Sequence, residues 1–421
     1  MIAQTFLTIR RISRILWVRV TLILALSILA ALSAEILDPL IPPASKDRFS
    51  QQATLPLLNI LANGMLAVTT FSLGVMVSTH RGMAEQTTPR IHRLLMEDTR
   101  TQTMLATFIG AFVFALVAII LYRAGYYSDS ASVIVFAATV LVIATIVVSL
   151  VRWISHLSEI GSIDYALART EATAKETLRQ LKDWPNLGGR RFQADSVPAD
   201  ATEITAARSG FIRRIAMDDL QTCAEDAKGR IYIELLPGDP ILQGQRLGRA
   251  VGPDPENLRR AFVIEQNRTY EQDARYALQV LRETGSKALS PGINDPGTAI
   301  EVTARLERLL WEFLRADRAG GEPQYTRVYV PDLRPATLID IAFRDLARDG
   351  AGFQDVLGAI ARALQTLNTL CEDEPKRMIA DLYSGLRQHA EIGLRTENER
   401  DHIAALLNDA AIPDLAPDHD T

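Results

Sequence analysis

Small and polar side chains recur along one apolar stretch near the start of the chain. They are Asn59, Asn63, Ala67, Thr70, Gly74 and Ser78. Spacings of three and four residues put them on one face of a helix. In a membrane, such a face either packs against neighbouring helices or lines water. The candidate pore-lining residues are therefore Asn59, Asn63, Thr70, Gly74 and Ser78, with helix packing as the alternative.

A second group of residues forms a rigid corner, "ALSPGINDPGTA", between two amphipathic helical stretches. Asp295 is placed to cap the second helix, and Pro296 suits its first position, where a missing N–H costs nothing. The corner is read first as a structural cap; binding of an anion by the helix start, or a subunit contact, are the alternatives. Its candidate site residues are Ser290, Pro291, Gly292, Asn294, Asp295, Pro296 and Thr298.

Four arginines stand beside the apolar stretches: Arg81, Arg90, Arg93 and Arg100. The excess of positive charge on the inner side of membranes accounts for them, and the same charges make them candidates for binding lipid headgroups.

The sequence offers no further chemistry. His80, His92 and His156 lack metal-ligand spacing, and Cys223 and Cys371 belong to no motif. A nucleophile elbow, a Walker loop, a dinucleotide fingerprint and H-E-x-x-H are all missing. We expect no enzyme activity, no metal and no cofactor.

Four apolar stretches must position the candidate pore residues: about 15–37, 57–79, 104–122 and 131–151. Each is close to the roughly 20 residues that cross a bilayer as a helix. The sequence therefore predicts four transmembrane helices in a domain of residues 1–151. The first run is too long for a signal peptide and is read as a retained anchor. No Asp or Glu lies in the middle of a span, so proton-coupled transport has little support.

Beyond residue 151 the composition becomes polar. A helical stalk and linker is expected over 152–187, a small β-rich module over 188–254, a helical domain over 255–408 and a flexible tail over 409–421. Strand-like patterns are "SGFIRRI", "RIYIELL" and "QRLGRAV", with "DDLQTCAEDAK" as a short helix and "QYTRVYV" as a later strand. The "LPGDPILQGQRLG" turn is similar to that of lipoyl- or biotinyl-type barrels, but no lysine lies between Ile231 and Val251, so a covalent cofactor is not expected.

Charge separates the two parts of the chain. Of 45 Lys and Arg and 50 Asp and Glu, the first 151 residues hold 11 and 7, so the remainder is acidic. An acidic domain disfavours nucleic acid as a partner, because such binding depends on neutralising phosphates.

Several motifs together resemble one known family. They are "ALSPGINDPGTA", "TTPR" after the second span, "SGFIRRI" followed by "LPGDPILQGQRL", and "NRTYEQDARYALQVL". The chain is similar to a family of bacterial predicted membrane proteins catalogued as a domain of unknown function. The resemblance implies four spans and a cytosolic domain, and it implies no reaction.

Arginine placement predicts the orientation. Arg10, Arg11, Arg14 and Arg19 precede the first span, and four more fill the loop between the second and third, whereas the opposite loops carry only Lys46, Arg48 and Arg123. We expect a multi-pass protein of the bacterial inner membrane with both termini cytoplasmic.

Three classes of function follow from these features. The first is a homo-oligomeric ion channel or pore gated by its cytosolic domain. The second is a non-conducting membrane scaffold or sensor whose cytosolic domain binds a protein or small ligand. An enzyme at the membrane has the least support. Membrane lipid and further copies of the chain are the expected partners.

Overall fold

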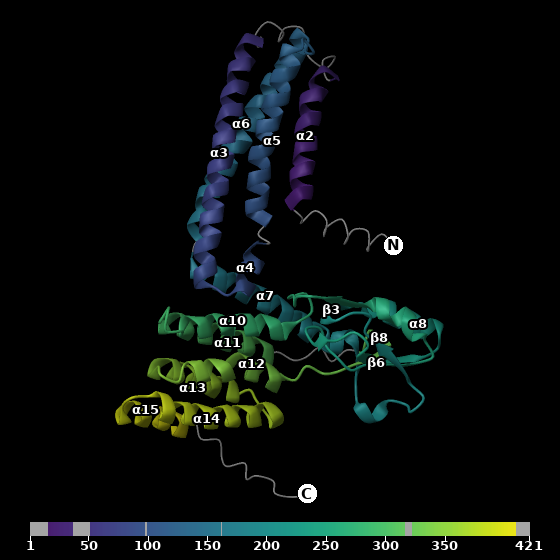
Figure 1. Cartoon of the computed structure of the whole chain (residues 1–421), viewed down its shortest axis with the longest axis vertical. Helices are drawn as coiled ribbons and strands as arrows, with labels where there is room; N and C mark the ends of the chain where they lie inside the picture. The colour runs from purple at the N-terminus through teal and green to yellow at the C-terminus, as the bar shows by residue number, and fades with distance from the viewer. Residues whose placement is uncertain (1–15, 37–50, 97–98, 161, 316–321, 410–421) are drawn as a thin grey trace, which may run out of the picture. The chain divides into compact units, whose positions relative to one another are not determined.

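The computed structural model describes residues 16–36, 51–96, 99–160, 162–315 and 322–409 (Figure 1). The chain divides into two compact units, Met1–Ala166 and Leu167–Thr421. We call them the apolar unit and the polar unit. Several features of the sequence lie outside the described residues: Arg10, Arg11, Arg14, Lys46, Arg48, the tail from residue 410, and the side chains of Arg19 and His80.

The described residues of the apolar unit form helices joined by short connections such as 87–88 and 124–128. Its helices are α2 (Leu16–Ile36), α3 (Gln51–Gln86), α4 (Pro89–Met96), α5 (Thr99–Arg123) and α6 (Asp129–Ile160). Three segments are long and apolar enough to cross a membrane: Ala53–Met83, Arg100–Arg123 and Ala131–Leu157. They contain the expected spans 57–79, 104–122 and 131–151. In α2 only the shorter apolar segment Val20–Ala34 is found, so the fourth span remains a prediction.

Helix α3 begins at Gln51, six residues before the expected start of the second span at residue 57. Polar residues such as Gln51 and Gln52 continue the helix beyond its apolar part, and a hydropathy pattern alone places the helix start too late.

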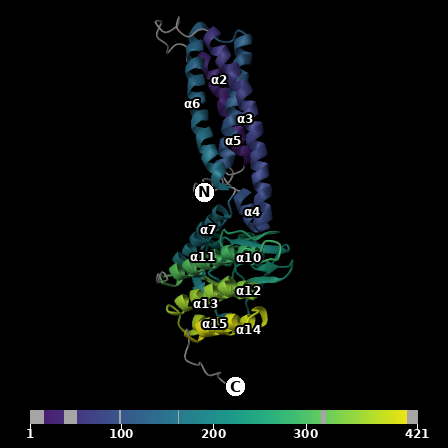
Figure 2. The ribbon, with the colours of Figure 1, turned by 90° about the vertical axis from the view of Figure 1, so that its left-hand side faces the viewer.

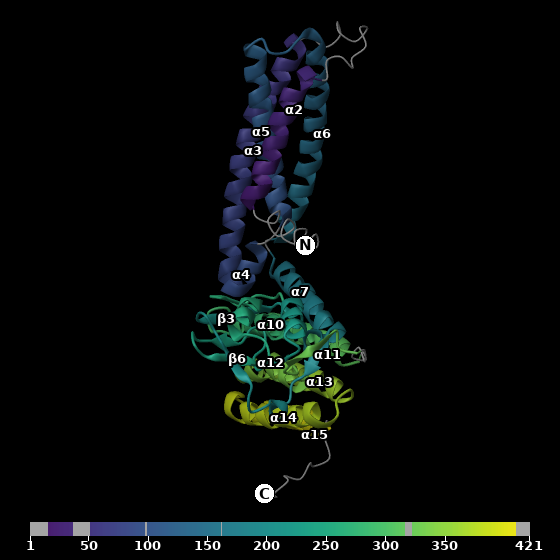
Figure 3. The same cartoon turned by 90° about the vertical axis from the view of Figure 1, so that its right-hand side faces the viewer.

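Helix α5 is the centre of the apolar unit, and α2, α3 and α6 all contact it (Figures 2 and 3). Its buried residues include the small Ala111, Ala115 and Ala118 beside the large Phe108 and Phe114. A side chain added at Gly110 would collide with Ile23 and would lie 3.1 Å from Ser27 Oγ of α2. Small residues let helix backbones approach closely where lipid supplies no hydrophobic driving force, so α2 and α5 form a tight pair.

The polar unit contains two sheets, one five-stranded in the order β1-β8-β4-β6-β2 and one three-stranded in the order β5-β3-β7. The strands are β1 (Gly189–Arg191), β2 (Thr202–Thr205), β3 (Gly210–Ile215), β4 (Arg230–Ile233), β5 (Pro240–Ile241), β6 (Arg246–Val251), β7 (Phe262–Glu265) and β8 (Tyr325–Val330). Helix α8 (Met217–Asp226) completes this part, whose shared core includes Ile212, Ile231 and Val328.

The predicted strands at β3, β4, β6 and β8 are confirmed, as is the short helix α8. The sequence predicts a helical domain from residue 255 onward. Strand β7 lies near its start and pairs with β3, so the prediction is wrong for this segment. Strand β8 pairs in parallel with both β1 and β4, so a segment distant in sequence completes the five-stranded sheet.

The helical part of the polar unit is layered (Figure 3). Its helices are α7 (Ile163–Asp183), whose first residues belong to the apolar unit, α10 (Ala274–Ala288), α11 (Pro296–Arg315), α12 (Pro335–Asp349), α13 (Gln354–Asn368), α14 (Asp373–Gly393) and α15 (Glu397–Asp409). Short segments are α9 (Pro255–Leu258) and the 3-10 turns Pro185–Gly188, Ala194–Ser196 and Arg259–Ala261. Helix α10 packs on α11 and α12, α11 on α13, and α12 on α14. Each layer buries apolar residues such as Leu281, Leu310 and Phe343 against the next.

Candidate functional site

The polar residues predicted on the second span form an exposed stripe along α3. Asn59, Asn63, Thr70, Gly74 and Ser78 are all exposed in the chain. Among the described side chains of the same helix, the buried ones are Thr54, Leu58, Leu61, Ala62, Met65, Ser72 and Met83. At about 100° per residue, the two sets lie on opposite sides of the helix. The stripe therefore faces away from α5 and α6, and it does not pack against other helices of the same chain.

The stripe adds polar groups to an outward face of α3 that also carries large exposed apolar side chains, among them Ile60, Phe71 and Val77. The outward faces of α2 and α6 carry large apolar side chains such as Leu22, Leu26, Leu141 and Val148. Such surfaces suit lipid. Both asparagines of the apolar helices, Asn59 and Asn63, lie on α3.

Backbone hydrogen bonds satisfy only part of this polarity. The Asn59 amide donates to the Leu55 carbonyl oxygen at 2.9 Å, and the Thr70 hydroxyl donates to the Leu66 carbonyl oxygen at 2.9 Å. An amide has two donors and an acceptor, so one such bond leaves the rest of the Asn59 side chain to find other partners. A side chain added at Gly74 would meet no atom within 4 Å. This surface is open and is suited to water or to a second protein chain.

The candidate headgroup residues lie near the ends of α3, α4 and α5. Arg81, Arg90, Arg93 and Arg100 are exposed. In α4 the apolar side chains of Ile91 and Leu95 are buried instead, which makes this short helix amphipathic. Such a helix suits a boundary between apolar and aqueous surroundings.

The corner at residues 288–299 is a helix stop and a helix start joined by hydrogen bonds. Asp295 Oδ1 accepts the backbone N–H of Thr298 at 3.1 Å, and Oδ2 accepts the Thr298 hydroxyl at 2.6 Å. The Asp295 N–H donates to the Ala288 carbonyl oxygen at 2.8 Å, and the Ser290 hydroxyl donates to the Lys287 carbonyl oxygen at 2.6 Å. The corner is thus closed by its own polar groups.

The geometry of the corner disfavours an anion at the start of α11. These hydrogen bonds from Thr298 hold the pKa of the Asp295 carboxyl below its ordinary value, so the side chain is negative near neutral pH. A carboxylate that already accepts the helix N–H donors repels a second anion there. Pro291, Gly292 and Asn294 are exposed on the outer side of the corner, and Asn294 has a left-handed backbone with φ of 53°.

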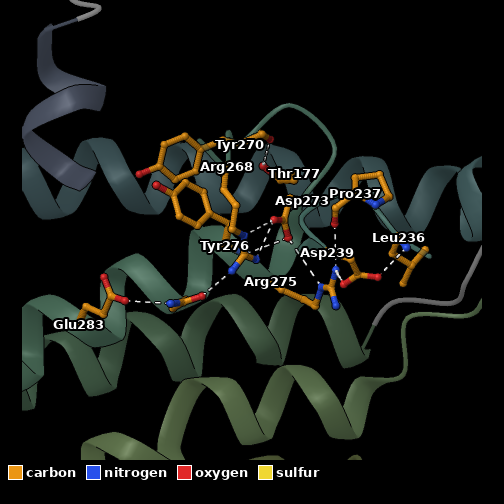
Figure 4. A network of polar contacts seen from close by, with 11 residues as sticks. Thr177, Leu236, Pro237, Asp239, Arg268, Tyr270, Asp273, Arg275, Tyr276 and Glu283 are labelled. Atoms are coloured by element: carbon orange, nitrogen blue, oxygen red, sulfur yellow. Dashed lines mark hydrogen bonds and ion pairs between the residues drawn. The ribbon is translucent and has the colours of Figure 1, made fainter. Parts of the chain in front are cut away.

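A buried ionic network lies where the β strands, α7 and α10 meet (Figure 4). Asp273, whose side chain is 1% exposed, binds Arg268 with Oδ2 to Nη2 at 2.7 Å and accepts the Tyr276 N–H at the start of α10. Arg275 binds Asp239 at 2.7 Å and the Pro237 carbonyl oxygen at 2.9 Å. Burial raises the pKa of the Asp273 carboxyl, and the two arginines oppose that rise.

The loop that contains Asp239 fits against this network without room for a side chain. Gly238 has φ of 94°, and an added Cβ would collide with the Asp273 carboxylate. A cavity of about 20 Å³ lies beside it, lined in part by Asn186, Gln272, Asp273 and Arg275. That volume is enough for about one water molecule. The cavity is therefore too small for a larger ligand, and the role of the network is structural. It connects the β strands, α7 and α10 of the polar unit.

Sequence reasoning did not identify this network. Its residues lie in two stretches quoted above, "LPGDP" and "NRTYEQDARYALQVL", which the sequence presents only as part of a turn and as a motif of the family resemblance. The signal that could have found it is the aspartate three residues before Tyr276, in the position of a helix cap, with an arginine on either side.

Other titratable groups do not gather into a site within the described part of the chain. No group of three His, Cys, Asp or Glu residues there could hold a metal. His156 is buried with its ring 6.1 Å from that of Tyr165. Burial raises the pKa of the Cys371 thiol to about 11, so this thiol is unreactive near neutral pH.

Comparisons with known proteins, like the apolar helices, indicate a membrane protein. Uncharacterized proteins from Mycobacterium bovis and Mycobacterium tuberculosis are 26% identical over 317 residues, which cover 70% of this chain. The chain spans 60% of the length of these relatives. No solved structure matches it. Residues 13–366 match the family described as predicted membrane protein (DUF2254), and the chain belongs to that family.

Proposed function

We propose that the protein is a homo-oligomeric pore of the bacterial inner membrane, in which the stripe on α3 faces a shared water-filled axis. The observation that carries this proposal is the position of Asn59, Asn63 and Thr70 opposite the packed side of α3. Polar groups in hydrocarbon are costly unless they meet water or another polar group. Several copies arranged with α3 inward would remove these side chains from lipid and leave the apolar faces of α2 and α6 outside.

The polar unit is proposed to gate this pore. Its α7 begins three residues after α6 ends and is held to α11 by ion pairs between Glu171 and both Arg305 and Arg308. A shift of α11 would therefore carry α7, and the chain connection would pass that shift to α6. The exposed Arg90 and Arg93 are proposed to contact lipid headgroups, which would anchor α4 while α7 moves.

Thiol labelling tests the pore. Single cysteines at Asn63, Thr70 and Ser78 are made in a background without Cys223 and Cys371 and exposed to a small aqueous thiol reagent. Reaction at these three positions, protection at the outward α6 residues Leu141 and Val148, and ion flux from the purified protein in liposomes would support the pore. Uniform protection with no flux would overturn it.

The alternative is a non-conducting scaffold or sensor in which the same stripes pack dry against each other. Gly74→Leu separates the two arrangements, because the added side chain meets nothing within its own chain. In a pore it narrows the lumen, so flux falls while the oligomer persists. In a dry interface it clashes between copies, so the oligomer dissociates. Gly110→Leu is the control, since its clash with Ile23 lies within one chain.

A further inference from the structure

The polar stripe of α3 ends in a positive charge. Arg81 follows Ser78 by three residues, a spacing that keeps it on the same helix face. Its side chain is exposed, and it lies two residues before the end of the membrane-crossing segment Ala53–Met83. Within the described residues, no carboxylate pairs with Arg81. An exposed guanidinium group therefore lies at one end of the stripe.

No negative charge accompanies Arg81 within the span. Between Ala53 and Met83 the sequence contains no Asp, Glu or Lys, and Arg81 is the only arginine. The rest of the stripe consists of neutral amide, hydroxyl and small side chains. If several copies meet along α3, the charged part of the path is a ring of arginines at one mouth.

We propose that this ring selects small monovalent anions, such as chloride, as the species that crosses the pore. Rings of arginine or lysine favour anions in pores by the same electrostatic attraction. At about 5 Å in water, one such charge changes the local concentration of a monovalent ion roughly four-fold. The inference rests on the proposed function, because Arg81 can select an ion only if α3 lines a path.

Reversal potentials in planar bilayers test the inference with the full chain. Under a KCl gradient, the wild-type current should reverse toward the chloride equilibrium potential. Arg81→Gln should lower the chloride-to-potassium permeability ratio several-fold, and Arg81→Glu should favour potassium. Arg152→Gln is the matched control, because Arg152 is exposed on α6 and lies outside the stripe; it should leave the ratio unchanged.

The measurements distinguish failure of the pore proposal from failure of the selectivity proposal. Absence of any current from a folded oligomer would overturn the pore itself, and with it the role of Arg81. A current that reverses toward potassium, or a chloride preference that Arg81→Gln leaves unchanged, would overturn the selectivity ring while the pore stands. Equal effects of Arg81→Gln and Arg152→Gln would assign the preference to surface charge in general and would also contradict the ring.

Discussion

Asp295 shows how one side chain fixes a change of direction between two helices. Its carboxylate accepts two hydrogen bonds from Thr298, and its N–H binds back to the Ala288 carbonyl oxygen at the end of α10. The corner therefore depends on a residue that is itself exposed, and solvent access makes its contribution measurable by titration.

Replacing Asp295 by Ala should lower the free energy of unfolding by about 0.5–2 kcal/mol, because the cap of α11 is lost. Pro296→Ala should have little effect, since the first helical residue needs no N–H partner. Thermal or denaturant unfolding of the purified variants measures both changes. Unchanged stability of Asp295→Ala, together with lost activity, would show that the corner serves a ligand or a subunit contact instead.

The lowered pKa of Asp295 also predicts that the stability of the folded state depends on pH. The pKa of Asp295 is lowered on folding, so its charge stabilises the folded state above the pKa of an unfolded aspartate, about 3.9. That contribution disappears as the pH falls through the lower folded pKa. The stability difference between wild type and Asp295→Asn should therefore be constant near neutral pH and shrink below about pH 4. A difference that grows on acidification would contradict this assignment.

Two glycines test how closely the loop at Gly238 fits the buried network. Gly238 and Gly244 both have positive φ, 94° and 80°, but a side chain at Gly244 would meet no atom within 4 Å. Gly244→Ala should cost about 1 kcal/mol from backbone strain alone. Gly238→Ala should cost more, because its methyl group also displaces the Asp273 carboxylate from Arg268. Equal losses of stability in the two variants would show that the network yields without cost.

At the scale of elements, α7 is part of the polar unit more firmly than its charged sequence indicates. The stretch "GSIDYALARTE" reads as a solvated helix face, yet Glu171 is only 18% exposed and lies 2.5 Å from Arg305 and 2.8 Å from Arg308. Thr177 adds a hydrogen bond to the Tyr270 carbonyl oxygen at 3.3 Å. Half-buried ion pairs that share a partner hold a helix in place better than separate surface pairs.

We expect Glu171→Gln to loosen α7 from α11, because Arg305 and Arg308 both lose their shared carboxylate. Amide hydrogen exchange along residues 167–183 should become faster, while exchange in α13 should stay the same. Lys175→Gln is the control, because Lys175 and its partner Glu312 are both about half exposed and their pair contributes little. If both variants give the same exchange, the proposed anchoring of α7 by Glu171 is wrong.

Local pattern predicted the elements better than their partners. Alternating residues identified β3, β4, β6 and β8, but the three-residue β1 and the two-residue β5 are too short for a period to show. Likewise, spacing placed Asn63 and Thr70 on one face of α3, while the side on which that helix packs depends on α5 and α6. The position of Asp273 as a helix cap can be read from the sequence, but its partner Asp239–Arg275 pair could not be placed beside it, because the segments are joined only by the fold.

For the whole molecule, the decisive structural question is whether α2 crosses the membrane. It packs along α5, a membrane-crossing helix, with Gly110 against Ile23, and its outward residues Leu22, Leu26 and Leu29 are exposed. A helix of 21 residues is about 31 Å long, close to the thickness of the hydrocarbon core. Leaving α2 in water would expose leucines whose burial is each worth roughly 1.5–3 kcal/mol.

Four spans place the N-terminal side of α2 and the polar unit on the same side of the membrane, whereas three spans place them on opposite sides. We expect a reporter fused before α2 and one fused after Leu181 to be active in the cytoplasm, because arginines flank the inner ends of the spans. A reporter inserted at Lys46 should be active only on the outer side. Opposite locations for the first two fusions would leave α2 on the surface and α3 as the first span. The polar stripe would then still cross the bilayer, but the tight α2–α5 pair would have to break on insertion, and Gly110→Leu should no longer lower the stability of the single chain.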